Sequence, residues 1–251
     1  MAAPLPASPP MAPPTAPTAA PLAAPRSGLA VGAAACAGIC DRLLERFNAA
    51  MVGRPDLMAG RTSLTVYRGM LGMSENVFIN VKNRSHTITA EVEIPKNGAK
   101  GVLLAQAGRF GGWSLYLKDG KPSYTYNWLG LQRYTVAAKQ ALPAGKATIR
   151  YEFAYDGGGV GKGGTGTLFV NGTKVATGRI DRTQCCAFSA DEGADVGADE
   201  GTPVIEAYKV PFKFTGKIAK VTIELKDMKT ADADEAEQAR KVATLKKARS
   251  D

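Results

Sequence analysis

The most constraining feature of the sequence is Asn171-Gly172, which stands between two short alternations of apolar and polar residues in Gly163–Ile180. Both turn residues tolerate the positive φ that a two-residue hairpin loop requires. The stretch therefore predicts two antiparallel strands joined by a tight turn. Before the turn, Leu168 and Val170 fall on one face of the first strand.

Short strands and glycine turns of the same kind continue through most of the chain, and helix-forming patterns are few. They predict a single antiparallel β-sandwich of the jelly-roll type, similar to concanavalin and laminin-G modules. The expected strands are Thr62–Tyr67, Val77–Val81, His86–Pro95, Gly101–Ala107, Trp113–Lys118, Pro122–Trp128, Lys146–Tyr155, the two arms of Gly163–Ile180, and Lys217–Lys226.

The composition divides the chain into four segments. Residues 1–40 are rich in Pro and Ala and predict a disordered linker. Residues 41–61 form a connector with a short helix, and residues 62–226 form the sandwich. Residues 227–251 carry acidic and then basic side chains, an order that suits a helix dipole, so we expect a charged helical tail. The 25 Pro/Ala-rich residues before the apolar stretch at 28–40 are not the layout of a secretory signal, which favours a cytoplasmic location.

The net charge of +9 is compatible with a polyanionic partner, but the basic and aromatic residues form no nucleic-acid recognition module. No apolar segment is long enough to span a membrane. We therefore expect neither nucleic acid nor membrane as a partner. The four cysteines show no CxxC spacing and His86 is the single histidine, so the usual zinc patterns are absent, and the cysteine usage indicates a reducing compartment.

Two loops carry residues that invite a chemical interpretation. The glycine loop 156–165 lacks the Walker spacing and opens a strand, so we interpret it as a connection between strands. The acidic stretch Ser189–Glu206 offers Asp191, Asp195 and Asp199 as oxygen ligands for Ca²⁺, but it does not have the EF-hand pattern. A solvated acidic loop is the alternative, and we expect no metal or other cofactor in this chain.

Aromatic and arginine side chains gather around one predicted hairpin, where they could stack on sugar or aryl rings and pair with anions. The candidate substrate-contact residues are Arg109, Trp113, Tyr126, Trp128 and Arg133. The alternative is core packing, because Tyr124, Tyr126 and Trp128 share one face of their strand and would be buried together.

Several blocks of the sequence resemble the C-terminal region of bacterial arylsulfatases, in matching order and spacing. These blocks are Asn80–Pro95, Gly101–Pro122, Gly161–Gly172 and Phe188–Val204, and Asp41–Asn48 and Gly53–Leu57 resemble the connector that follows the sulfatase catalytic domain. The resemblance covers about Asp41 to Leu225. The formylglycine motif C/S-x-P-x-R is absent, so no catalytic residue of the family can be assigned to this chain.

The resemblance implies an accessory C-terminal domain of a sulfuric ester hydrolase, inactive alone, whose partner is a sulfatase catalytic domain that uses a divalent metal such as Ca²⁺. Such a domain would pack on the catalytic domain and line its cleft for aryl or carbohydrate sulfates with Arg109 to Trp113. Two alternatives remain at this point. The chain could be a free-standing carbohydrate-binding module that stacks sugars on Trp113, Tyr126 and Trp128, or a fragment left by a truncated gene.

Overall fold

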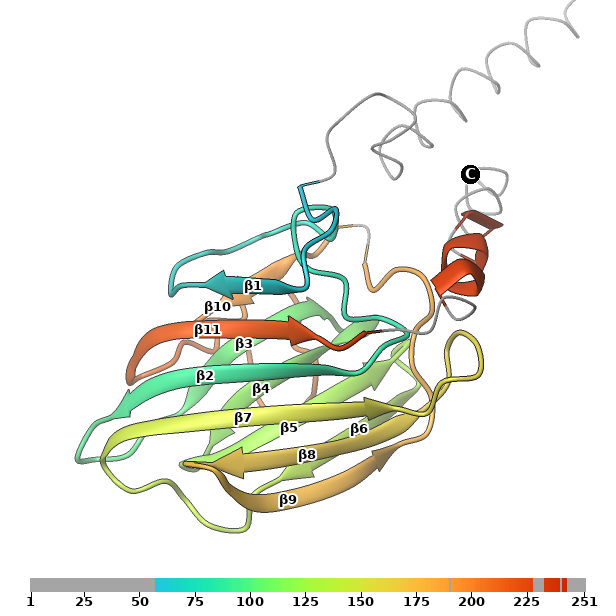
Figure 1. The fold of residues 1–251 in the computed structure, drawn as a ribbon. Coiled ribbons are helices and arrows are strands. Elements are labelled where there is room, and N and C mark those ends of the chain that lie inside the picture. The colour runs from blue at the N-terminus through green and yellow to red at the C-terminus, as the bar shows by residue number, and fades with distance from the viewer. Residues whose placement is uncertain (1–56, 190, 228–232, 240, 243–251) are drawn as a thin grey trace, which may run out of the picture. The chain divides into compact units, whose positions relative to one another are not determined.

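The computed structural model describes residues 57–189, 191–227, 233–239 and 241–242. Within them, eleven strands form two antiparallel sheets that pack face to face (Figure 1). Sheet A has the order β1 (Ser63–Val66), β11 (Lys217–Leu225), β2 (His86–Ile94), β7 (Gly145–Tyr155), β8 (Gly164–Val170) and β9 (Thr173–Ile180). Sheet B has the order β10 (Ala194–Val196), β3 (Gly101–Gly108), β4 (Gly111–Lys118), β5 (Lys121–Trp128) and β6 (Gln132–Ala137). The predicted β-sandwich is confirmed.

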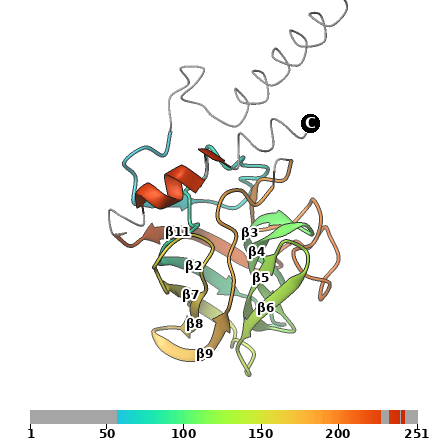
Figure 2. The same ribbon diagram turned by 90° about the vertical axis from the view of Figure 1, so that its right-hand side faces the viewer.

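The core lies between the two sheets, which Figure 2 shows as two layers seen from the side. Residues facing inward alternate with outward residues along each strand, and Ile88, Ala90, Val92 and Ile94 of β2 are all buried, as the sequence pattern predicts. The middle of the core is aromatic. The rings of Tyr124 and Tyr151 come from opposite sheets and stack with their centroids 3.6 Å apart.

The predicted hairpin is formed by β8 and β9. Its turn residues Asn171 and Gly172 have φ values of 49° and 82°, as the Asn-Gly signal requires. The Asn171 side chain also accepts a hydrogen bond from the backbone N–H of Thr148, with 2.8 Å between the two atoms. The turn is therefore tied to the neighbouring strand β7.

Other expectations for secondary structure need correction. Val77–Val81 is not a strand, because its apolar side chains reach the core from a turn: Phe78 and Ile79 are buried, and the Phe78 N–H bonds to the Ser74 carbonyl. Strands β6 and β10 are not among those that the sequence patterns predict. In the predicted tail, residues 233–239 and 241–242 are helical, and no described helix has the length and apolar character needed to cross a membrane. The predicted linker 1–40 and most of the connector 41–61 lie outside the described residues.

A strap formed by residues 200–214 covers part of the outer face of sheet B. Val204 and Tyr208 of the strap pack on Val102, Ala105 and Tyr116 in a second apolar cluster. The rings of Tyr116 and Tyr208 meet edge to face, with their centroids 5.3 Å apart. The strap therefore removes the centre of this sheet face from solvent and leaves the outer face of sheet A as the open one.

Candidate functional site

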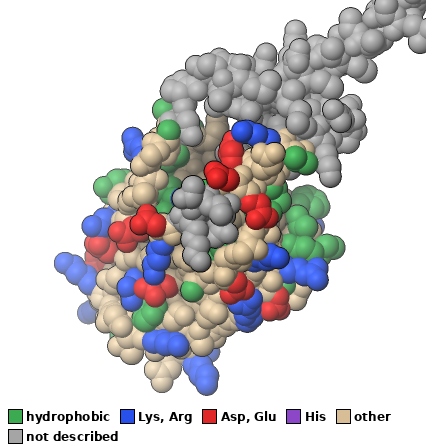
Figure 3. Space-filling view, turned by 45° about the vertical axis from the view of Figure 1, so that its right-hand side comes forward, with side chains coloured by type: hydrophobic (Ala, Val, Ile, Leu, Met, Phe, Trp, Pro, Cys, Tyr) green, Lys and Arg blue, Asp and Glu red, His purple; other side chains and the backbone are tan. Residues whose placement is uncertain are grey.

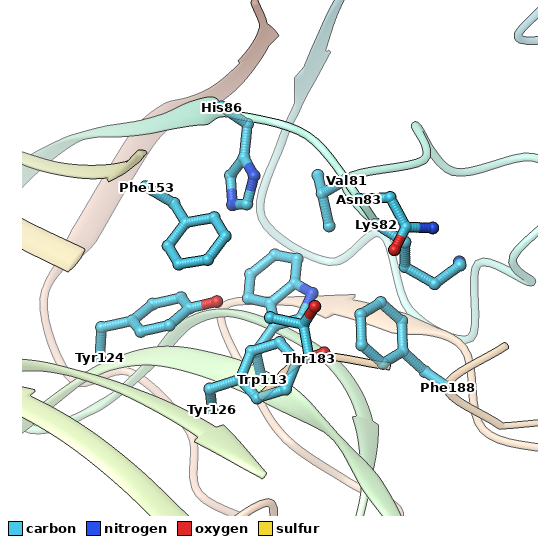
Figure 4. Close-up of a pocket in the computed structure, with 10 residues that line it drawn as sticks. All are labelled: Val81, Lys82, Asn83, His86, Trp113, Tyr124, Tyr126, Phe153, Thr183 and Phe188. Carbon is cyan, nitrogen blue, oxygen red and sulfur yellow. The ribbon is translucent and has the colours of Figure 1, made fainter. Parts of the chain in front are cut away.

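A small cavity lies between the two sheets of the sandwich and is drawn in Figure 4. The cavity measures about 10 Å³, which is the size of a single water molecule. It is lined by Val81, Lys82, Asn83, His86, Trp113, Tyr124, Tyr126, Phe153, Thr183 and Phe188. A space of this size excludes an organic ligand, so this cavity is not a substrate site.

His86 projects its ring into this cavity next to Phe153 (Figure 4). Its Nδ1 lies 3.2 Å from the carbonyl oxygen of Arg84, which assigns the ring proton to Nδ1, while Nε2 is buried with no hydrogen-bond partner among the described residues. Burial, together with the charge of Arg84, lowers the pKa of His86 to about 4. His86 therefore stands at the start of β2 as a buried residue that is neutral at neutral pH, and its side chain does not face solvent.

The predicted substrate-contact residues are not brought together on one surface. Trp113 is fully buried and donates from Nε1 to the side-chain oxygen of Gln106 at 3.0 Å. Tyr126 is buried and accepts a hydrogen bond from the backbone N–H of Gln184 at 2.7 Å. Trp128 is only partly exposed, at the end of β5. The predicted stacking platform of Trp113, Tyr126 and Trp128 is therefore absent from the surface, and these rings follow the core-packing alternative.

The two predicted arginines lie apart from those rings. Arg109 is exposed in the β3–β4 turn. Arg133 is mostly buried on β6 and pairs with Glu206 of the strap at 2.8 Å. Arg109 therefore remains accessible for contacts outside this chain, whereas Arg133 helps to hold the strap on sheet B.

The three predicted calcium ligands lie on β10 and in the loops that flank it, and two of them accept hydrogen bonds from neighbouring segments. Asp195 accepts a hydrogen bond from the N–H of Gly72 at 2.7 Å, and Asp191 is exposed. Asp199 is buried and accepts a hydrogen bond from the Tyr208 hydroxyl at 2.5 Å, and burial raises its pKa to about 6. In the described part of the chain, no group of three or more His, Cys, Asp or Glu side chains could hold a metal ion.

Adjacent cysteines on a strand are expected to face opposite sides, one buried and one exposed, but Cys185 and Cys186 lie in the segment between β9 and β10 and not on a strand. Cys185 and Cys186 are joined to each other by a disulfide bond, and both side chains are half-buried. The Cys185 carbonyl accepts a hydrogen bond from the Asn83 amide at 2.6 Å. The hydrogen bond fixes the segment beside Asn83, one of the residues that line the cavity.

Two neighbouring turns at one end of sheet B carry exposed apolar side chains, which the sequence analysis did not identify. Phe110 in the β3–β4 turn is 77% exposed, and Leu129 and Leu131 in the β5–β6 turn are 48% and 76% exposed. Asn127 joins the turns, because its amide donates to the carbonyl of Arg109 at 2.9 Å and its side-chain oxygen accepts from Gly130. We call Phe110, Leu129 and Leu131 the tip patch. Exposed apolar groups held in one place indicate a docking surface.

A groove of about 450 Å³ opens on the outer face of sheet A, a volume within the range of small-molecule sites. It lies over β2, β7 and β11 and reaches the β8–β9 turn. Its polar lining consists of Glu91, Glu93, Lys146, Thr148, Asn171 and Lys217, and its apolar lining is Val92, Ala147, Ile218 and Ala219. The groove is a candidate binding site that the sequence analysis missed.

Strand register arranges the charges of the groove in rows. Glu93 of β2 is opposite Lys146 of β7 and Lys217 of β11. In the next row, Glu91 is opposite Thr148 and Lys220. Each carboxylate has one ion pair: Glu93 with Lys217 at 3.4 Å and Glu91 with Lys220 at 3.1 Å. The groove therefore presents hydrogen-bond donors and acceptors side by side.

No protein-family model matches the chain, and no curated protein matches its sequence. Solved structures with a similar shape include the CBM40 module of the Ruminococcus gnavus IT-sialidase bound to α2,3 sialyllactose, at 15% identity and a TM-score of 0.45 over 71% of this chain and 96% of that one. Domain 4 of a Geobacillus stearothermophilus arabinanase, in complex with arabinotriose, has 14% identity and a TM-score of 0.41 over 63% and 68%. Domains LG4-5 of the mouse laminin α1 chain have 15% identity and a TM-score of 0.38 over 67% and 40%. At these values the similarity identifies no ligand and no residue role for this chain.

Proposed function

We propose that this chain is a carbohydrate-binding module whose ligand lies in the groove on the outer face of sheet A. The observation that carries the proposal is the groove itself, with carboxylates, ammonium groups, a hydroxyl and an amide along a volume of about 450 Å³. Each sugar hydroxyl both donates and accepts hydrogen bonds, so a lining that mixes donors and acceptors suits a chain of sugars.

The rest of the described surface and interior supports this location. The interior cavity is too small for a ligand, and the strap covers the centre of the outer face of sheet B. Carboxylates that are paired with lysines can still accept further hydrogen bonds, because each ionised carboxylate has about four lone-pair sites. Glu91 and Glu93 are therefore the expected acceptors for sugar hydroxyls.

Replacing both carboxylates, in the double variant Glu91→Ala and Glu93→Ala, is expected to weaken glycan binding at least about tenfold, since a hydrogen bond to a charged group contributes about 1.5–3 kcal/mol. Binding is measured by isothermal titration calorimetry with dextran, xylan and arabinan, and with sialyllactose and arabinotriose, the sugars bound in two of the similar structures.

The matched control is the double variant Glu152→Ala and Glu224→Ala, which removes the same charge from the same face of sheet A outside the groove. This control is expected to bind like the unchanged protein. Equal binding by both double variants and the unchanged protein would remove the groove as the site, and no binding to any of the sugars would remove the function.

A second candidate function is that of an accessory domain which packs on a sulfatase-type catalytic domain, as the sequence resemblance implies. The observation that favours it is the tip patch, which presents Phe110, Leu129 and Leu131 to solvent beside Arg109, the residue expected to approach a partner's cleft. Apolar groups in such positions contribute binding energy only when another surface covers them.

The test mixes the chain with an arylsulfatase catalytic domain that lacks its own C-terminal region and measures complex formation by analytical ultracentrifugation. The double variant Phe110→Ser and Leu131→Ser is expected to abolish the complex, whereas Tyr67→Ser, another exposed ring outside the patch, retains it. The chain alone is expected to give no turnover of a nitrophenyl sulfate. Turnover above the metal blank, or a complex that the tip-patch variant leaves intact, would refute this role.

A further inference from the structure

One end of the sandwich is rich in lysine. The antiparallel topology brings the β2–β3, β4–β5, β6–β7 and β8–β9 connections to the same end, together with the chain that enters β11. These segments and their flanking positions carry Lys96, Lys100, Lys118, Lys121, Lys139, Lys146, Lys174, Lys213 and Lys217, and all of these side chains are exposed. We call this set the lysine end.

Backbone contacts confirm that these connections are neighbours. Leu142 of the β6–β7 connection donates its N–H to the carbonyl of Gly120 in the β4–β5 turn at 2.9 Å. Lys100 of the β2–β3 connection donates its N–H to the hydroxyl of Thr215 at 3.0 Å, close to the start of β11. The lysine end is therefore one surface rather than a set of separate turns. Figure 3, in which the right-hand side of Figure 1 comes forward, shows Lys and Arg side chains interspersed with Asp and Glu side chains over that face.

Few carboxylates balance this charge. Lys217 pairs with Glu93 at 3.4 Å and Lys213 pairs with Glu200 at 3.3 Å. Among the described residues, the other seven lysines of the set form no ion pair. Unpaired like charges in one region repel each other and raise the local concentration of anions. The lysine end is therefore built to attract a multivalent anion.

The groove and the lysine end are continuous, because Lys146 and Lys217 belong to both. We propose that the ligand is an anionic polysaccharide, which places sugar hydroxyls in the groove and sulfate or carboxylate substituents on the lysine end. This proposal rests on the proposed carbohydrate-binding function and specifies its ligand class.

The carboxylates of the groove favour a polysaccharide over a nucleic acid. Glu91 and Glu93 line the same path as the lysines. A nucleic acid has a phosphate at every residue and would bring some of them against these carboxylates, at a cost in repulsion. A polysaccharide can present neutral hydroxyls to Glu91 and Glu93 and its charged groups to the lysines.

The experiment measures the affinity of the full chain for dextran sulfate, alginate and neutral dextran at several salt concentrations. The test variant replaces Lys96, Lys139 and Lys174 by Gln, which leaves the groove lining unchanged. The control variant replaces Arg61, Lys162 and Lys226 by Gln, which removes the same charge from exposed positions at the opposite end of the sandwich.

The expected result is that dextran sulfate or alginate binds more tightly than dextran, with an affinity that falls as salt rises. The test variant should lose at least about tenfold in affinity. The magnitude of the slope of log K against log salt should decrease by about 2, because each of the three lost charge contacts contributes about 0.7 to it. The control variant should keep most of the affinity. Tighter binding of dextran sulfate would identify sulfate as the preferred substituent, and tighter binding of alginate would identify carboxylate.

Three outcomes would overturn the proposal. Equal affinity for neutral dextran and the charged polymers would show that the ligand is not anionic, while leaving carbohydrate binding intact. Equal losses in the test and control variants would show that only the net charge matters. Single-stranded DNA that binds as tightly as dextran sulfate would assign the lysine end to nucleic acids. Failure of the proposed function itself is recognised separately, because no sugar polymer, neutral or charged, then binds the chain.

Discussion

The substitution Trp113→Ala is expected to lower the free energy of unfolding by about 3–5 kcal/mol, the usual cost of truncating a large buried aromatic side chain. Trp113 is fully buried on β4, between Phe78 and Tyr124, whose ring centroids lie 6.3 and 6.0 Å away. Its removal opens a cavity between the sheets and leaves the side-chain oxygen of Gln106 without its donor. Chemical denaturation followed by circular dichroism measures the change.

The matched comparison is Trp128→Ala at the end of β5, where the indole is only partly buried and the Arg182 guanidinium lies over it at 5.1 Å. We expect a clearly smaller loss of stability there, because less apolar area leaves the core. A loss below about 1 kcal/mol for Trp113→Ala, combined with a loss of glycan binding, would instead support the surface-platform hypothesis.

Acidification is expected to destabilise the protein through His86 by about 3 kcal/mol, since its pKa is 6.5 in the unfolded chain and about 4 in the folded one. Between these values the unfolded state binds more protons than the folded state, so the stabilising contribution is present above about pH 6.5 and is lost as the pH falls through 4. The cause is the burial of a ring whose Nε2 has no partner in the described structure to stabilise a charge.

The measurement compares urea unfolding of the protein and of His86→Gln at about pH 7.5 and at about pH 3.5. Asp199 has the opposite sign: its pKa is raised to about 6, so its stabilising contribution is present below 3.8 and is lost as the pH rises through 6. Because Asp199 is common to both proteins, the difference between them isolates His86. That difference should change by about 3 kcal/mol between the two pH values. A constant difference would contradict the buried, neutral state of His86.

Local sequence patterns predicted most of the strands because each pattern has a direct structural requirement. Asn171-Gly172 satisfied the positive φ of a hairpin turn, and the alternation of Ile88 to Ile94 matched the inner face of β2. The apolar run Val77–Val81 does not distinguish a strand from a turn, because apolar residues can reach a core from either.

The candidate site could not be predicted in the same way, because tertiary pairing creates it. Glu93, Lys146 and Lys217 are far apart in the sequence, and only the register of β7, β2 and β11 places them in one row. Trp113 and Tyr126 were predicted to contact a ligand because they are aromatic, but both lie on the inner face of sheet B and are buried. The position of Phe110 directly before Gly111-Gly112, in an expected turn, is a local sequence signal for the tip patch, since an apolar side chain in a turn can be exposed.

The most direct test of the account is a nuclear magnetic resonance titration of the ¹⁵N-labelled chain with dextran, xylan and arabinan oligosaccharides, sialyllactose and arabinotriose. If the groove binds carbohydrate, the amide signals of Thr148, Asn171 and Ala219 shift as sugar is added, whereas those of Phe110 and Leu131 stay in place. Shifts confined to the tip patch, or no shift with any of these sugars, would contradict the proposed carbohydrate-binding function.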